Sequence, residues 1–252
     1  MGLDIYAGTF VRYYAKNWKT QTQQFCEKNG LKYNIIRANP KEHENTTSVE
    51  EIMEGVDSWQ EQMKIMLSNH DINSFEFWDE NKEKEYYTDK PDWDAFGAML
   101  LMTAATVLKK DFPKDYQKGM DFHPYIYEAF EQKLSNWSLF AGVCHFIPQK
   151  ECMTFDWLLA NGKEASISTV ASLKAELDII NQLLWNADKK TILEWNHSEG
   201  YPTDGTVQNG IYQKGTVHTV YDTESLAKYA FSIFYQAVQF AEKNNVPVIL
   251  DF

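Results

Sequence analysis

The stretch from Tyr86 to Leu108 constrains the fold most, because an acidic, aromatic turn runs there directly into the most apolar segment of the chain. Lys90 and Pro91 mark the junction, since proline disfavours the α conformation in the residue before it and suits the first turn of a helix. Asp92 or its neighbour can cap the helix that follows. The half from Phe96 to Leu108 is apolar on nearly every side, which predicts a buried helix that other helices pack against.

Both ends of the chain indicate strands. The run from Leu3 to Phe10 is rich in aromatic and β-branched residues, and Gly2 and Gly8 bound its first part. A helical spacing of apolar residues continues from Val11 to Gly30, and Leu31 to Ala38 indicates a second strand. These elements predict a β-α-β opening with parallel strands and a right-handed crossover. The last strand, Val246 to Phe252, is so apolar that we expect it to pair inside the sheet, near the first.

Capping and turn signals predict the other elements. Ser48 and Glu51 have the spacing of a capping box, and the amphipathic helix that they begin ends near Asn69. Asn161-Gly162 can supply the two positive-φ residues of a type I′ turn, which predicts an antiparallel hairpin with strands at about 153–160 and 163–168. A weaker hairpin is predicted near Lys214-Gly215. Further helices are expected over residues 125–134, 172–185, 189–195 and 222–243.

Together these elements predict an α+β (mixed α/β) fold, with a single mixed sheet flanked by four or more helices. The chain has 252 residues and can therefore bury a core without disulfides or a structural metal. It contains no internal repeat and no low-complexity linker. We therefore predict one globular domain over residues 1–252.

The cysteines and the apolar segments predict a cytoplasmic protein. Cys26, Cys144 and Cys152 form no C-x-x-C motif, and the opening segment lacks the basic region and long apolar run of a secretory signal. An odd number of cysteines in this setting is typical of reduced thiols in a cytosol. The longest apolar run, Ala95 to Leu108, is too short to span a bilayer.

The charge balance excludes several classes of partner. Asp and Glu number 36 against 24 Lys and Arg, a formal net charge of −12. This charge opposes binding to nucleic acids and anionic lipids, which are polyanions, and favours a basic protein partner. The chain has no phosphate-binding glycine loop, dinucleotide fingerprint or nucleophile elbow, and its histidines and cysteines lack the spacing of a zinc site. We therefore predict no cofactor and no nucleic-acid partner.

Three carboxylates on the turn form a candidate metal site. Asp89, Asp92 and Asp94 follow the pattern D-x-x-D-x-D, with Asp4 on the first strand as a fourth candidate. Carboxylate oxygens converging in this way could bind Mg²⁺ or Ca²⁺. The other interpretation is that Asp92 caps the helix and Asp94 favours its positive end, as acidic residues in first turns do.

Aromatic residues near the same turn form a candidate partner-binding site. Tyr14, Tyr87, Trp93 and Tyr201, together with Asp89, are predicted to lie on turns or outer faces. Tyrosine and tryptophan provide much of the binding energy in protein interfaces, and nearby carboxylates would suit a basic partner. The alternative is that these aromatic side chains are half-buried around an aromatic-rich core.

Three stretches of the chain carry a resemblance. The opening MGLDIYAGTFVRYYAKNW, the turn YYTDKPDWDAFGAMLL and the later SLKAELDIINQLLW resemble a widespread family of uncharacterised bacterial proteins. The resemblance implies a bacterial, cytosolic, single-domain family. It implies no activity, cofactor or catalytic residue.

The sequence favours a binding function over catalysis. We expect a non-enzymatic, acidic, cytosolic binding protein, of a kind such as an immunity-type or inhibitor protein that masks a basic toxin or nuclease. The alternative function is a metal-dependent hydrolase that uses Asp89, Asp92 and Asp94.

Overall fold

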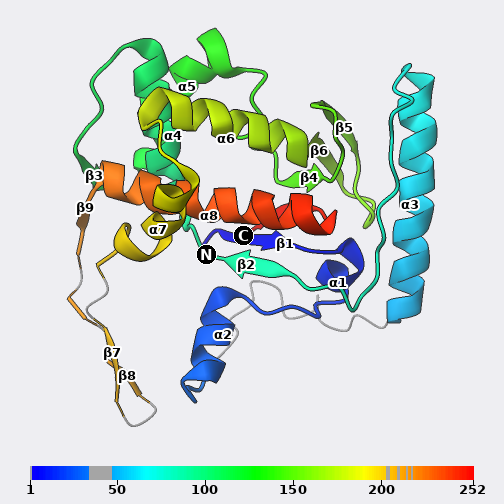
Figure 1. The fold of residues 1–252 in the computed structure, drawn as a ribbon, viewed down its shortest axis with the longest axis horizontal. Coiled ribbons are helices and arrows are strands. Elements are labelled where there is room, and N and C mark those ends of the chain that lie inside the picture. The colour runs from blue at the N-terminus through cyan, green and yellow to red at the C-terminus, as the bar shows by residue number, and fades with distance from the viewer. Residues whose placement is uncertain (1, 34–46, 203–204, 209–210, 214, 217) are drawn as a thin grey trace.

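The fold is α+β, with one mixed six-stranded sheet between two sets of helices (Figure 1). The computed structural model describes residues 2–33, 47–202, 205–208, 211–213, 215–216 and 218–252. The strands of the sheet lie in the order β2 (Tyr87–Asp89), β1 (Asp4–Ala7), β10 (Val248–Asp251), β4 (His145–Ile147), β6 (Glu164–Thr169) and β5 (Thr154–Leu158). Neighbouring strands are antiparallel except β4 and β6, which are parallel.

Helices cover both faces of this sheet. The described residues form eight α-helices: α1 (Phe10–Tyr14), α2 (Gln21–Lys28), α3 (Val49–Asn69), α4 (Trp93–Leu108), α5 (Pro124–Ala129), α6 (Val170–Leu184), α7 (Lys189–Ser198) and α8 (Thr223–Asn244). A 3-10 turn, Met120–Phe122, precedes α5, and a π-helical turn, Phe130–Leu134, follows it. No helix of the described part of the chain is long and apolar enough to cross a membrane.

Side-chain alternation along the central strands separates two hydrophobic cores. On β1, Ile5 and Ala7 join the larger core, which also contains buried residues of α4, α6 and α8. Tyr6 points the other way and joins the smaller core with Phe10 of α1 and Trp59 of α3. The sheet is therefore buried on both sides over its central strands.

The predicted central helix is confirmed. In α4, the eleven residues from Ala95 to Ala105 are all buried. The ring of Phe96 stacks on Phe234 of α8 at 5.3 Å between ring centroids. The capping box at Ser48 and Glu51 is also present at the start of α3, where each residue's side chain accepts a backbone N–H from the other.

The last strand also lies inside the sheet as predicted, but the β-α-β opening is wrong. The edges of β1 are taken by β10 on one side and β2 on the other, both antiparallel. The short apolar strand β10 is buried on both faces, and pairing next to β1 satisfies its backbone. Of the predicted second strand, residues 34–38 lie outside the described part of the chain.

The single helix predicted from Val11 to Gly30 is two helices. The chain leaves α1 through Lys16, whose φ of 54° belongs to the left-handed region. Thr20 then begins α2 with a capping box completed by Gln23. A cap at this position competes with helix continuation, which the apolar spacing alone did not reveal.

One predicted hairpin is confirmed with a different turn, and the other is wrong. Only Gly162 of the Asn161-Gly162 pair has a positive φ, so β5 and β6 are joined by a three-residue loop with a glycine bulge. Lys214 lies outside the described residues, and the strands on either side of it do not pair with each other. Instead β8 (Ile211–Gln213) pairs with β7 (Thr206–Gln208), and β9 (Val220–Asp222) pairs with β3 (Asp115–Gln117).

Candidate functional site

The turn from Thr88 to Asp94 connects β2 to α4 in an unusual backbone conformation. Asp92 has φ 59° and ψ 160°, a region populated almost only by glycine, at a cost of roughly 1–3 kcal/mol. Two hydrogen bonds hold it there: its N–H donates to the Leu3 carbonyl at 3.2 Å, and its carboxylate accepts the Trp93 N–H at 2.9 Å. Asp92 is therefore the helix cap that the sequence predicted.

The three carboxylates predicted as metal ligands lie in different surroundings. Asp89 is buried and accepts the Asn196 amide at 3.1 Å and the Lys90 N–H at 2.8 Å. Asp94 lies in the first turn of α4, where burial and the nearby Asp92 and Asp121 carboxylates raise its pKa. In the described residues no group of three or more Asp, Glu, His or Cys side chains could hold a metal ion. The metal-dependent alternative stays a prediction that this geometry does not favour.

The aromatic partner candidates are all half-buried. Tyr14 stacks on Phe10 of α1, and Tyr87 packs against Phe240 of α8. Trp93 lies between Phe96 and Phe252, while Tyr201 lies between Tyr221 and Tyr229. They fit the alternative interpretation, in which these rings are satellites of the core, and their role in partner binding stays a prediction.

The structure brings together a polar group that the sequence did not reveal as a unit. Asp4 and Asp251 lie opposite each other on β1 and β10, on the face of the sheet that α1 covers. The hydroxyl of Tyr13 in α1 donates a hydrogen bond to the Asp251 carboxylate at 2.5 Å. Thr88 and His145 lie two residues further along the strands, at the two ends of the row that has Tyr6 and Ile249 in its middle. We call Asp4, Tyr13, Thr88, His145 and Asp251 the sheet-end cluster.

Several polar atoms of the sheet-end cluster are unpaired. Asp4 Oδ1, Thr88 Oγ1 and His145 Nδ1 are buried and have no hydrogen-bond partner in the described part of the chain. Such groups are uncommon in folded proteins and often mark a site that binds something. The cluster therefore has three polar atoms available on three different strands.

The protonation states in the cluster follow from burial. Burial raises the pKa of Asp4 to about 6 against the opposing attraction of Lys90, and the Asp251 carboxylate adds to the rise. Burial lowers the pKa of His145 to about 4, so its imidazole is neutral at pH 7. The pKa of the adjacent Cys144 thiol is raised by burial to about 11, which keeps the thiol protonated and a poor nucleophile.

Sequence patterns did not find the cluster because its members come from five separate elements, β1, α1, β2, β4 and β10. One signal was present: the apolar opening run and the apolar final strand each contain a single aspartate, Asp4 and Asp251. We predicted that these two strands lie near each other. A carboxylate in each of two paired, buried strands could have identified the centre of the cluster.

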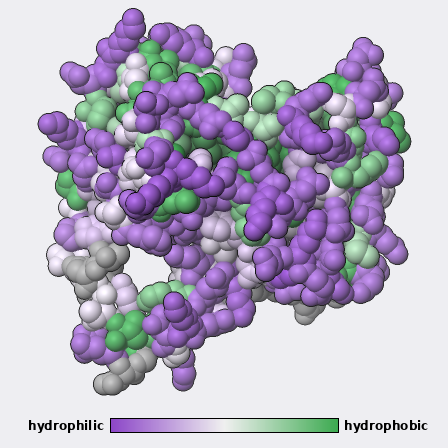
Figure 2. Space-filling view, viewed as in Figure 1, coloured by the Kyte–Doolittle hydropathy of each residue, from purple (hydrophilic) through white to green (hydrophobic). Residues whose placement is uncertain are grey.

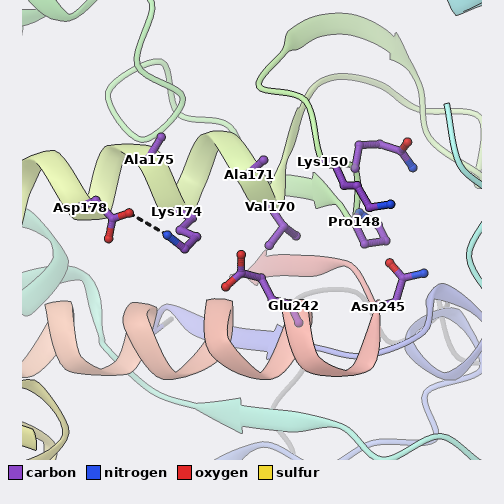
Figure 3. Close-up of a pocket in the computed structure, with 11 residues that line it drawn as sticks. Pro148, Lys150, Val170, Ala171, Lys174, Ala175, Asp178, Glu242 and Asn245 are labelled. Carbon is purple, nitrogen blue, oxygen red and sulfur yellow. Dashed lines mark hydrogen bonds and ion pairs between the residues drawn. The ribbon is translucent and has the colours of Figure 1, made fainter. Parts of the chain in front are cut away.

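A second candidate is the groove between α6 and α8 (Figure 3). Its apolar floor includes Val170 and Ala241, and Figure 3 shows Lys174 and Asp178 forming an ion pair across from Glu242. The groove holds about 450 Å³, within the range of small-molecule sites. None of its lining residues carries a buried unpaired polar atom, so the sheet-end cluster is the stronger site.

Replacing Asp4 by asparagine is expected to stabilise the protein at pH 8. A folded-state pKa of about 6 means that the native state disfavours the charged carboxylate of Asp4. Asp4 therefore lowers the free energy of unfolding increasingly as pH rises from about 3.8 through about 6. Solvent reaches this half-buried group and screens the effect, so the gain is roughly 1 kcal/mol. Urea unfolding at pH 8 and pH 4 measures it. The gain should disappear at pH 4 and be absent at both pH values in Asp111→Asn, an exposed control.

Comparisons of the chain with models of protein families, with curated protein sequences and with solved structures found no match. The geometry and charge of the described residues are therefore the basis for assigning a function.

Proposed function

We propose that the chain is a non-enzymatic, cytosolic binding protein that holds a basic protein partner on the outer face of α3. The supporting observation is the charge of this helix and its arrangement on the outer face. In α3, five carboxylates and one lysine give a net charge of −4, a third of the charge of the whole chain. A basic toxin or nuclease masked by an immunity-type or inhibitor protein is the partner class that this charge suits.

The acidic side chains of α3 form one row. Glu50, Glu54, Asp57 and Glu61 recur at intervals of four, three and four residues, which places them on the same side of the helix. The buried face of α3, with Trp59 among its residues, points the opposite way into the smaller core. Figure 1 shows α3 at one edge of the molecule, with no other drawn helix or strand on its outer side.

Few cations neutralise this row. Among the described residues, Lys82 contacts Glu50 at 3.6 Å, and no ion pair joins the other three carboxylates of the row. Like charges spaced in this way repel one another along a helix, a cost of a few tenths of a kcal/mol for each pair. A basic partner would remove that repulsion on binding.

Exposed apolar side chains flank the acidic row. Met53 is 39% exposed and Ile65 is 61% exposed on the same side of α3, and Phe77 is 42% exposed with its ring under Lys64. Methionine and aromatic residues are enriched in protein interfaces, where apolar contacts hold a complex that charge has steered together. Figure 2 shows the same combination over this part of the surface, mostly hydrophilic with small apolar patches.

The test compares two charge-reversed proteins. In the α3 variant, Glu50, Glu54, Asp57 and Glu61 are all replaced by lysine. In the control variant, the exposed residues Asp111, Glu131, Glu151 and Glu164 are replaced by lysine, so the net charge changes equally. Each protein is immobilised on a resin and incubated with bacterial lysate at low salt. The bound proteins are then quantified by mass spectrometry.

We expect the wild type and the control variant to enrich the same basic protein, and the α3 variant to lose it. Calorimetry with the purified partner then tests whether the two proteins form a direct complex. Equal loss in both variants would mean that only net charge matters. If the wild type enriches no basic protein, the proposed function is wrong.

A further inference from the structure

We infer that the sheet-end cluster is a binding site for an organic cation, an alkylammonium or guanidinium group. This inference is independent of the acidic face of α3. It rests on the unpaired acceptors of the cluster, on the aromatic rings beside them and on the local charge.

Two acceptors of the cluster are unpaired within the described residues. Asp4 has a buried oxygen that receives no hydrogen bond from them, and the neutral imidazole of His145 has a buried Nδ1 in the same condition, which can accept a hydrogen bond. Asp251 lies directly across from Asp4, and from the described residues its side chain receives a single hydrogen bond, that of the Tyr13 hydroxyl. An ammonium group has three N–H donors and no acceptor, so it matches these groups in both charge and hydrogen-bond type.

A group of aromatic rings surrounds Tyr13. The ring of Trp18 stacks on Tyr13 at 5.8 Å, and Tyr6 packs against both of them at 5.0–5.5 Å. Aromatic faces attract cations, and proteins use carboxylates and aromatic rings together to recognise ammonium ligands. The outer side of this group already attracts cations of the chain itself, since Lys16 lies 4.9 Å from the Tyr13 ring centroid and Arg12 lies 5.0 Å from that of Tyr86.

The charge around the cluster determines the sign of the ligand that it favours. Asp4 interacts with the carboxylates of Asp251, Asp92 and Asp89, and Lys90 is the cation whose charge opposes them at Asp4. The local charge is therefore negative, which disfavours an anionic ligand. A metal ion is disfavoured as well, because no suitable group of three ligands exists in the described residues.

The experiment titrates two probes that present the same chemistry from different sources. Propylammonium represents a free amine, and N-acetyl-lysine-methylamide represents the side chain of a peptide. Binding at pH 8 is followed by NMR chemical-shift changes, with sodium chloride at equal ionic strength as the blank. Asp4→Asn removes the central carboxylate, and Asp111→Asn is the matched exposed control.

We expect saturable binding of at least one probe to the wild type and to Asp111→Asn. In Asp4→Asn the affinity should fall about tenfold or more, because a charge-assisted hydrogen bond is lost. A stronger response to propylammonium assigns the site to free amines, and a stronger response to the lysine compound assigns it to peptides. Equal affinity of Asp4→Asn and Asp111→Asn, or no saturable binding by the wild type, would overturn the inference. The substitution removes no hydrogen bond of Asp4 Oδ1, so a folded variant is expected.

Discussion

Replacing Glu80 by alanine is expected to lower the free energy of unfolding by about 3 kcal/mol or more. Glu80 is only 5% exposed, and its carboxylate accepts the Val11 N–H at 2.9 Å at the start of α1 and the Trp78 indole N–H at 2.5 Å. Alanine would leave both donors buried without partners, at about 1–3 kcal/mol each. Urea unfolding measures the loss.

A neighbouring residue provides the control for this prediction. Glu83 belongs to the same segment but is exposed, and Glu83→Ala is expected to change stability by less than about 0.5 kcal/mol. If both alanine variants have the same stability, Glu80 does not hold α1 against the 78–80 segment.

The cost of Glu80→Ala is also expected to depend on pH. Burial raises the pKa of Glu80 to about 7 against the hydrogen bonds from Val11 and Trp78, which lower it. The native state therefore binds the proton more tightly than the unfolded chain, and the stability that Glu80 provides is greatest below about pH 4.5 and declines as pH rises through about 7. Glu80→Ala should thus cost more at pH 5 than at pH 8, by up to about 3 kcal/mol. A larger cost at pH 8 would contradict this assignment.

Replacing Gly97 by alanine is expected to destabilise the protein by about 2 kcal/mol, although alanine is the better helix former. A Cβ at this position of α4 would lie 2.4 Å from the Tyr116 hydroxyl and 2.8 Å from the Asp121 backbone. The flexible hydroxyl could move, but the backbone of Asp121 would have to shift as well. Overpacking of this kind costs about 1–3 kcal/mol.

The same substitution in α3 should have the opposite sign. In the described part of the chain, no atom outside the local helix backbone lies within 4 Å of a Cβ at the exposed Gly55, so Gly55→Ala is expected to stabilise the protein by about 0.5–1 kcal/mol. Thermal and urea unfolding of the two variants can be compared directly. If Gly97→Ala is also stabilising, α4 does not approach the Met120–Phe122 turn as closely as described.

Local signals in the sequence predicted the elements whose stability is local. The Ser48 capping box, the all-round apolar α4 and the Asn161-Gly162 hairpin each depend on residues within a few positions of one another. Strand neighbours do not, since β1 lies next to β2 and β10, which come 80 and more residues later. The default parallel pairing failed because these distant strands compete for the same edges.

The sequence predicted those features of the candidate site that depend on local residues, and missed those that depend on distant ones. The turn was located, and Asp92 was assigned as a cap, from its position before an apolar helix. Tyr87, Trp93 and Tyr201 are half-buried because they pack against α8, β9 and Phe252, which no local pattern relates to the turn. The acidic row of α3 was readable at helical spacing, but only the structure shows which side of the helix is free.

The association rate constant between the protein and its basic partner, measured against ionic strength, tests the proposed function most directly. If the acidic row of α3 steers the partner, the rate for the wild type should fall steeply as salt screens the charges. The α3 variant should associate about tenfold more slowly or worse at low salt, with little salt dependence, while the control variant stays close to the wild type. The same rate and salt dependence for the α3 variant and the wild type would contradict the assignment of this face as the binding surface.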